Sequence, residues 1–192
     1  MKFIGKFIIL ILVISCSSKE NSLEQYANHP LNFAKQKINY PNNDFSIFIP
    51  KNWEWKAPYK ENTNDILGLF ANSKPNSNGL KSIILLKKYK SSVKSKDLKS
   101  EFDYLLKQIQ NHSQIKEIVD SGTTDIFNQE SYFFHTKSES NSNGSSEILN
   151  FLINSDKEGV YYNLTLSAPQ TTDFNTDMAV LVQSLKTFER LK

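Results

Sequence analysis

The stretch Val160-Tyr161-Tyr162-Asn163-Leu164-Thr165-Leu166-Ser167-Ala168 decides the fold class of this 192-residue chain. From Tyr162 to Ala168, large or apolar side chains alternate with Asn, Thr and Ser. A period of two residues is typical of a half-buried strand in an antiparallel sheet. A second apolar run covers residues 147–153, and the turn-forming residues 154–159 join the two runs. The sequence therefore predicts an antiparallel hairpin over 147–168.

More strands are predicted on the N-terminal side of this hairpin. They are expected at residues 38–40, 45–49, 66–71, 82–89, 115–119, 125–127 and 131–137. The first four form two pairs, each around a loop rich in Asn, Pro, Ser or Gly, and each pair is expected to be antiparallel neighbours. The polar stretch 138–146 is predicted to be a mobile hairpin loop.

Two segments change to the helical period. Between residues 96 and 109 the apolar residues recur at i, i+4, i+7, i+8 and i+11, and Ser95 is the expected N-cap. The same spacing predicts a last helix over 174–188, capped by Thr172 or Asp173. Hairpins interrupted by two isolated helices predict an α+β domain, a central antiparallel β-sheet flanked by helices.

The N-terminus has the pattern of a secretory leader. Lys2 and Lys6 precede an unbroken apolar run over 7–14, which is far shorter than the roughly 20 residues of a membrane-spanning helix. The run ends in Val13-Ile14-Ser15-Cys16, which resembles the lipobox of bacterial lipoproteins. In that resemblance Val13 and Ser15 belong to the recognition signal. It implies diacylglycerol transfer to Cys16 and cleavage before it.

This leader sets the expected organisation of the chain. We expect a lipoprotein signal peptide over 1–15, a flexible tether over 16–35 after the lipidated Cys16, and one globular domain over 36–192. Acyl chains anchor a protein at about 0.8 kcal/mol per buried CH₂, so the expected location is the bacterial cell envelope. Residues 17–20, Ser-Ser-Lys-Glu, resemble an outer-membrane sorting signal.

Cysteine count and charge exclude several classes of protein. Cys16 is the only cysteine, which excludes a disulfide framework and a thiolate metal cluster. Of 23 Lys and Arg, two lie in the leader, which leaves 21 against 20 Asp and Glu and a net charge of +1. No nucleic-acid partner is expected without a basic surplus. The lysine-rich run 87–99 is interpreted as a solvated strand edge and helix face, with an anionic surface as the alternative.

No catalytic residue, metal site or cofactor is predicted. The histidines His29, His112 and His135 form no ligand-spaced pair, and the scattered glycines form no phosphate-binding loop. Because His135 alternates with Phe133, we expect it on the solvent side of the sheet. Two carboxylate pairs, Asp120 with Asp125 and Asp173 with Asp177, fit turn and capping roles better than calcium binding or acid–base chemistry. The chain is therefore expected not to be an enzyme.

An aromatic cluster is the candidate binding surface. Trp53 and Trp55 lie two residues apart after a strand-ending proline, so in an extended chain both side chains point the same way. Both cannot easily enter one core. Two arrangements remain open. In one, a tryptophan is exposed as a binding anchor near Tyr59. In the other, both tryptophans cover the sheet edge under the loop 56–64.

Three stretches carry a family resemblance. They are Phe45-Ser46-Ile47-Phe48-Ile49-Pro50-Lys51-Asn52-Trp53, the strand Tyr161–Pro169, and Phe174 through Phe188. They resemble the PsbP-like family, that of the extrinsic photosystem II protein, which also includes a nuclear-import factor that binds the Ran GTPase. The resemblance implies a central antiparallel sheet between helices. It transfers no binding site, because fold alone does not supply function.

Two functional hypotheses from different classes follow. The first is a non-catalytic envelope lipoprotein, anchored to the membrane by lipid, whose monomeric PsbP-like domain binds a protein partner. The alternative is a carrier of a small apolar ligand, with Trp53, Trp55 and the aromatic strand 132–134 as pocket walls. The partner and the pathway are not encoded in these patterns.

Overall fold

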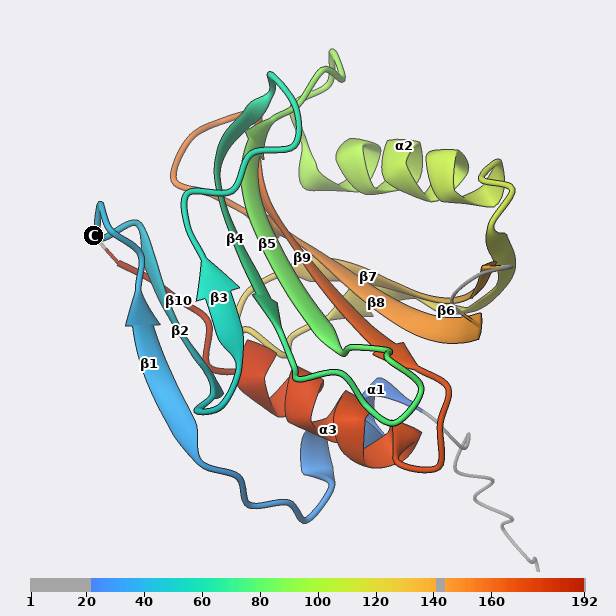
Figure 1. Cartoon of the computed structure of the whole chain (residues 1–192). Helices are drawn as coiled ribbons and strands as arrows, with labels where there is room; N and C mark the ends of the chain where they lie inside the picture. The colour runs from blue at the N-terminus through green and yellow to red at the C-terminus, as the bar shows by residue number, and fades with distance from the viewer. Residues whose placement is uncertain (1–21, 141–143, 192) are drawn as a thin grey trace, which may run out of the picture.

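The structure is a computed structural model, and it describes residues 22–140 and 144–191 (Figure 1). Within these residues the chain forms three helices and ten strands. The helices are α1 (Leu23–Asn28), α2 (Leu98–Gln110) and α3 (Phe174–Leu185). The strands are β1 (Lys35–Asn39), β2 (Phe45–Pro50), β3 (Glu54–Lys56), β4 (Asp65–Asn72), β5 (Ile83–Lys90), β6 (Ile115–Thr124), β7 (Ser131–Ser140), β8 (Gly144–Asn154), β9 (Val160–Pro169) and β10 (Glu189–Arg190).

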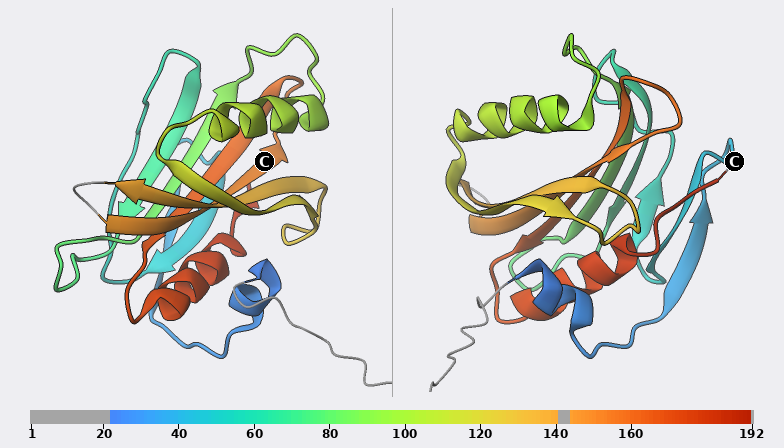
Figure 2. Two further views of the ribbon diagram at one scale, coloured as in Figure 1. Left: turned by 90° about the vertical axis from the view of Figure 1, so that its right-hand side faces the viewer. Right: turned by 180° about the vertical axis from the view of Figure 1, so that it is seen from behind.

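The strands form two sheets. Seven strands follow the order β3-β4-β5-β9-β8-β7-β6, and a smaller sheet has the order β1-β2-β10. Every pairing in both sheets is antiparallel. The large sheet is strongly curved, with α2 on its concave side and α3 on the other (Figures 1 and 2). The predicted α+β class is confirmed.

The predicted hairpin is present as β8 and β9. These strands pair from Ser146 opposite Pro169 to Asn154 opposite Tyr161. Leu164 and Leu166 are completely buried, while Asn163, Thr165 and Ser167, which alternate with them on the other face, are half-buried. Because β9 also pairs with β5, the strand whose alternation indicates the fold class lies in the middle of the sheet.

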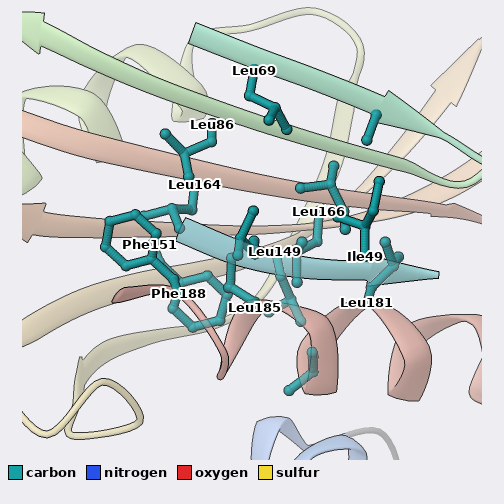
Figure 3. Packing of buried hydrophobic residues seen from close by; sticks show 14 of the residues in the cluster. Ile49, Leu69, Leu86, Leu149, Phe151, Leu164, Leu166, Leu181, Leu185 and Phe188 are labelled. Carbon is teal, nitrogen blue, oxygen red and sulfur yellow. The ribbon is translucent and has the colours of Figure 1, made fainter. Parts of the chain in front are cut away.

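The main core lies between the large sheet and the layer made by α3 and β2. Figure 3 shows it from close by, with Leu181 and Leu185 of α3 and Ile49 of β2 beside the sheet residues Leu164 and Leu166. All five side chains are fully buried. A fully buried side chain of this size contributes roughly 1.5–3 kcal/mol, so this layer provides most of the hydrophobic stabilisation.

The concave face has a smaller core under α2. Leu98 and Phe102 of α2 pack on Tyr132 and Phe134 of β7, and the Phe102 and Tyr132 rings lie 4.9 Å apart. The helix begins at Asp97, whose side chain accepts a hydrogen bond from the Ser100 N–H. Ser95, the expected N-cap, instead donates its hydroxyl to Asp97. The helical period predicts this helix correctly, but its N-cap is Asp97, two residues after the predicted Ser95.

Two further boundaries differ from the sequence predictions. Residues 125–127 form a turn and not a strand, because the Asn128 N–H bonds to the Asp125 carbonyl at 2.7 Å and closes the β6–β7 connection. The strands β7 and β8 extend into the polar stretch 138–146 and pair up to Ser140 opposite Gly144. Backbone pairing along the hairpin thus overrides the polar composition there, and residues 141–143 lie outside the described part of the chain.

Part of the expected tether over 16–35 is folded. It contains α1, whose N-cap is Ser22. Tyr26 of α1 is 2% exposed and meets the ring of Phe174 edge-on at 6.3 Å. The Gln183 side chain of α3 also donates to the His29 carbonyl at 2.7 Å. The folded domain therefore includes α1, because one buried tyrosine and α3 hold a short helix that has no apolar period.

The predictions for Val13, Ser15 and Cys16 lie outside the described residues. In the ranges 22–140 and 144–191, no helix combines the length and the apolar character needed to cross a membrane.

Candidate functional site

The two tryptophans of the predicted aromatic cluster differ in exposure. Trp53 is half-buried and packs against the main core. Trp55 lies on β3, which pairs only with β4 and forms one edge of the large sheet. Its side chain is 43% exposed. The structure thus gives the arrangement in which one tryptophan is exposed, and Trp55 is that residue.

Tyr59 lies on the other face of the same edge. Its ring is 5.8 Å from the ring of Phe70, and the Lys56 ammonium lies over both rings at 5.2 and 5.3 Å. Neighbouring strand residues point to opposite faces, so Lys56 and Trp55 face apart. Trp55 and Tyr59 of the predicted cluster therefore lie on opposite faces of the sheet, although both are at the same edge.

Gly68 allows the Tyr59 backbone to lie on the sheet. The Tyr59 N–H donates to the Gly68 carbonyl at 2.8 Å, and a Cβ at Gly68 would lie only 2.1 Å from the Tyr59 carbonyl oxygen. A side chain at this position would push the connection away from β4. The glycine therefore fixes the position of the residues that follow β3.

A second candidate is a charged cluster around Lys88, which sequence reasoning placed on a solvated edge. Lys88 is only 6% exposed. Its Nζ lies 2.7 Å from Asp44 Oδ1 and 3.2 Å from Asp156 Oδ1. The Tyr162 hydroxyl donates to Asp44 Oδ2 at 2.6 Å, and the ammonium lies 5.1 Å from the centre of the Tyr162 ring. Asp44 is thus fixed by two donors.

This cluster adjoins a cavity of about 780 Å³, which is lined by Asn42, Asn43, Asp44, Asp156, Tyr162, Arg190 and Leu191. The β1–β2 turn, the β8–β9 turn and the C-terminal segment meet here. Arg190 donates to the Asn154 carbonyl at 3.1 Å, and the Leu191 N–H donates to the Asp44 carbonyl at 3.0 Å. Three connections distant in sequence are therefore joined at one end of the sheet.

Burial and hydrogen bonds within the cluster shift the pKa values of Tyr162 and Asp156. Burial, and then the hydrogen bond to Asp44, raises the pKa of Tyr162 well above its ordinary value, so the phenol keeps its proton and donates it. The hydrogen bond from Lys88 lowers the pKa of the Asp156 carboxyl. At neutral pH the cavity is thus lined by the ionised carboxylate of Asp156 and the neutral phenol of Tyr162.

The prediction that His135 faces solvent is wrong. His135 and Glu147 are each 2% exposed, and their Nε2 and Oε2 atoms lie 2.6 Å apart. Gln170 donates to the other oxygen of Glu147 at 2.8 Å. Burial alone would raise the pKa of Glu147, but the hydrogen bonds from His135 and Gln170 hold it below its ordinary value. His135 does lie on the same face of β7 as Phe133, but that face is buried and not exposed to solvent.

The alternation of buried and exposed residues along a strand could have located Lys88 and His135, the strand residues of the two charged clusters. Lys88 follows Ile84 and Leu86 at intervals of two, and both of these are fully buried. His135 has the same relation to Phe133. Since a strand buries alternate residues, a charged residue in phase with apolar ones is expected to be buried together with a partner. The partners Asp44 and Glu147 come from other strands or turns, and the sequence does not identify them.

The pocket walls predicted for an apolar-ligand carrier do not meet. Tyr132 and Phe134 lie under α2 on β7, whereas Trp55 lies on β3 at the far end of the strand order. That version of the carrier hypothesis is wrong. Among residues 22–140 and 144–191, no group of three or more His, Cys, Asp or Glu side chains is arranged to hold a metal ion.

Comparison with known proteins identifies the fold. No protein-family profile and no curated protein sequence matches the chain. Among solved structures it is similar to cyanobacterial PsbP (CyanoP) from Synechocystis sp. PCC 6803, with a TM-score of 0.59 and 11% identity over 84% of this chain and 95% of that one. The Ran-binding protein Mog1p of Saccharomyces cerevisiae gives a TM-score of 0.53 and 11% identity over 83% and 96% of the two chains.

LpqN, a protein of Mycobacterium tuberculosis involved in cell envelope biogenesis, is also similar. Its TM-score is 0.52, with 11% identity over 90% of this chain and 98% of LpqN. The three similarities cover most of each chain at low identity, so they show a common fold and no common site. The resemblance to PsbP-like domains is confirmed at the level of fold.

Proposed function

We propose that this protein is a lipid-anchored lipoprotein of the bacterial cell envelope whose PsbP-like domain binds a protein partner without catalysis. The observation that carries the partner proposal is Trp55, a large aromatic side chain 43% exposed on the edge strand β3. Exposed tryptophans are favoured as anchors because they bury much apolar area at low entropic cost. An edge strand also offers backbone donors and acceptors to a partner on its outer side.

Two proteins of similar structure support this proposal. Mog1p is a Ran-binding protein, so one protein of this fold has a protein partner. LpqN is involved in cell envelope biogenesis, so another protein of this fold has a role in the envelope. The anchor itself rests on the sequence Val13-Ile14-Ser15-Cys16. The expected outer-membrane location rests on residues 17–20.

The partner proposal is tested by comparing two exposed aromatic residues. Trp55 on β3 and Tyr104 on α2 are 43% and 42% exposed. We expect affinity purification of the full chain from gently solubilised membranes to recover a reproducible partner. Trp55→Ala should reduce its recovery about tenfold or more, as for an interface hot spot, while Tyr104→Ala should leave it unchanged. Equal recovery with both variants would contradict binding at β3.

The anchor is tested by Cys16→Ala. The variant should leave the folded domain unchanged, as measured by circular dichroism, and should move the protein from the membrane fraction to the soluble fraction. A processed variant that stays on the membrane would show that another part of the chain binds it.

A further inference from the structure

We propose that the cavity beside Lys88 binds a small zwitterion that carries an acidic group and a primary amine. This site lies apart from the exposed edge at Trp55 and goes beyond the partner binding proposed above. It is formed by a fixed carboxylate, an exposed carboxylate and an arginine that converge on a cavity of about 780 Å³. That volume falls within the range of about 300–1,000 Å³ typical of small-molecule sites.

The part of the cluster behind the cavity is fixed in advance. Asp44 uses both carboxylate oxygens, one toward Lys88 at 2.7 Å and one toward the Tyr162 hydroxyl at 2.6 Å. Its side chain is 18% exposed and that of Lys88 is 7% exposed. A buried ion pair contributes little net stability compared with apolar residues of the same volume. The arrangement is therefore better explained by what it presents to the cavity.

The groups that face solvent have capacity for a ligand. Asp156 is 67% exposed, and Lys88 contacts only one of its oxygens, at the longer distance of 3.2 Å. A carboxylate accepts about four hydrogen bonds, so Asp156 can also accept from an ammonium group. Arg190 donates from Nη1 to the Asn154 carbonyl. A guanidinium has about five N–H donors, and the remaining ones suit a carboxylate or phosphate.

Charge balance selects the class of ligand. Asp44 and Asp156 carry two negative charges, and Lys88 and Arg190 carry two positive charges. A ligand with one net charge would unbalance this group, and such an imbalance is costly because the side chains of Lys88 and Asp44 are largely buried. A zwitterion places its acidic group at Arg190 and its ammonium at Asp156, and the site stays neutral. The shared chemistry of an amino acid and a phosphoethanolamine headgroup meets this requirement.

The test uses the full chain, labelled with ¹⁵N, in detergent micelles. The probe is glycerophosphoethanolamine, a phosphodiester with one negative and one positive charge, and the amide signals of Asn43, Asp156 and Leu191 are followed by two-dimensional NMR. We expect these signals to shift in a saturable manner. Ethanolamine alone, inorganic phosphate alone and glycerophosphocholine should bind about tenfold more weakly, because each lacks one of the two charged groups or the N–H donors of the amine.

Two exposed residues allow the site to be altered without unfolding the chain. Arg190→Gln and Asp156→Asn should each weaken binding of glycerophosphoethanolamine about tenfold. Their neighbours Glu189 and Lys157 do not line the cavity, so Glu189→Gln and Lys157→Gln are matched controls and should bind as the unaltered chain does. The proposal is overturned if no signal shifts, if glycerophosphocholine binds equally well, or if neither Arg190→Gln nor Asp156→Asn changes the affinity.

A second arm separates the two sources of the ligand. Micelles doped with a short-chain phosphatidylethanolamine are compared with micelles doped with the matching phosphatidylcholine. Shifts of the same three signals with the ethanolamine lipid, stronger than with free glycerophosphoethanolamine, assign a lipid headgroup. Stronger binding of the free compound assigns a soluble zwitterion. Equal shifts with both lipids would contradict a contact between the amine and Asp156.

Discussion

Two buried charged clusters lie on the same face of the large sheet, at opposite ends of the hairpin β8–β9. Glu147 pairs with Ala168 at one end, and Tyr162 pairs with Ile153 at the other. The His135–Glu147 pair is sealed, with both residues 2% exposed. The Lys88 cluster adjoins a cavity, and its second carboxylate, Asp156, is 67% exposed.

This difference separates a structural role from a binding role. A sealed pair touches no ligand, so its charges can only hold the strands and the connections around them. A cluster with one fixed and one exposed carboxylate holds its inner members in place and leaves its outer member free to change partner. The same elementary interaction, a buried carboxylate that accepts a hydrogen bond from a strand side chain, thus serves two purposes according to what lies beside it.

The largest expected effect comes from breaking the sealed pair. His135→Ala leaves the Glu147 carboxylate buried without its hydrogen bond from His135, and removing one partner of a buried charge costs about 3–5 kcal/mol. We expect a loss of this size in the free energy of unfolding, measured by urea denaturation. Lys137→Ala, at a surface pair with Glu117 at 3.3 Å, is the control and should cost under about 1 kcal/mol. A similar loss in both variants would contradict the sealed role.

Breaking the Lys88 cluster should cost less. Lys88→Met removes the ammonium but leaves Asp44 its bond from Tyr162 and contact with water in the cavity. We expect a loss of about 1–3 kcal/mol in the free energy of unfolding, smaller than the loss for His135→Ala. If Lys88→Met is the more damaging substitution, the cavity does not solvate Asp44.

The pH dependence of stability distinguishes the sealed pair further. The folded-state pKa of Glu147 lies below its unfolded value, so its ionised form contributes stability above an unfolded pKa of about 4.3. That contribution is lost as pH falls through the folded-state pKa. The double variant His135→Gln/Glu147→Gln removes both titrating groups. Its unfolding free energy should therefore change less than that of the unaltered chain between about pH 5 and pH 2. Equal acid sensitivity would mean that other carboxyls determine it.

The smallest effect is expected at Asp156. The Asp156→Asn substitution removes an exposed partner of Lys88, and exposed ion pairs contribute about 0–1 kcal/mol. The melting temperature should barely change, although the binding proposed above weakens. A loss of stability as large as that of Lys88→Met would show that Asp156 is part of the fixed cluster and unavailable to a ligand.

The sequence predicts the frame of the fold more reliably than its contacts. Alternation in β9 and the helical periods of α2 and α3 are local properties, and all three elements are present as expected. The strand partners of the first two hairpins also follow from short connections. The packing of α1 and the partners in the charged clusters depend on single contacts between distant segments. Examples are Tyr26 with Phe174, and Lys88 with Asp44. No local pattern encodes such contacts, so they were missed.

If Cys16 carries the proposed lipid, the position of α1 limits how far the domain can lie from the membrane. The N-cap of α1 is Ser22, and five residues separate it from Cys16. The six steps of an extended chain, at about 3.3–3.6 Å each, span roughly 20 Å, so the start of α1 would stay within that distance of the bilayer surface. A domain held this close could tilt and rotate but could not reach a distant target. A partner would then have to come to the membrane, or belong to it.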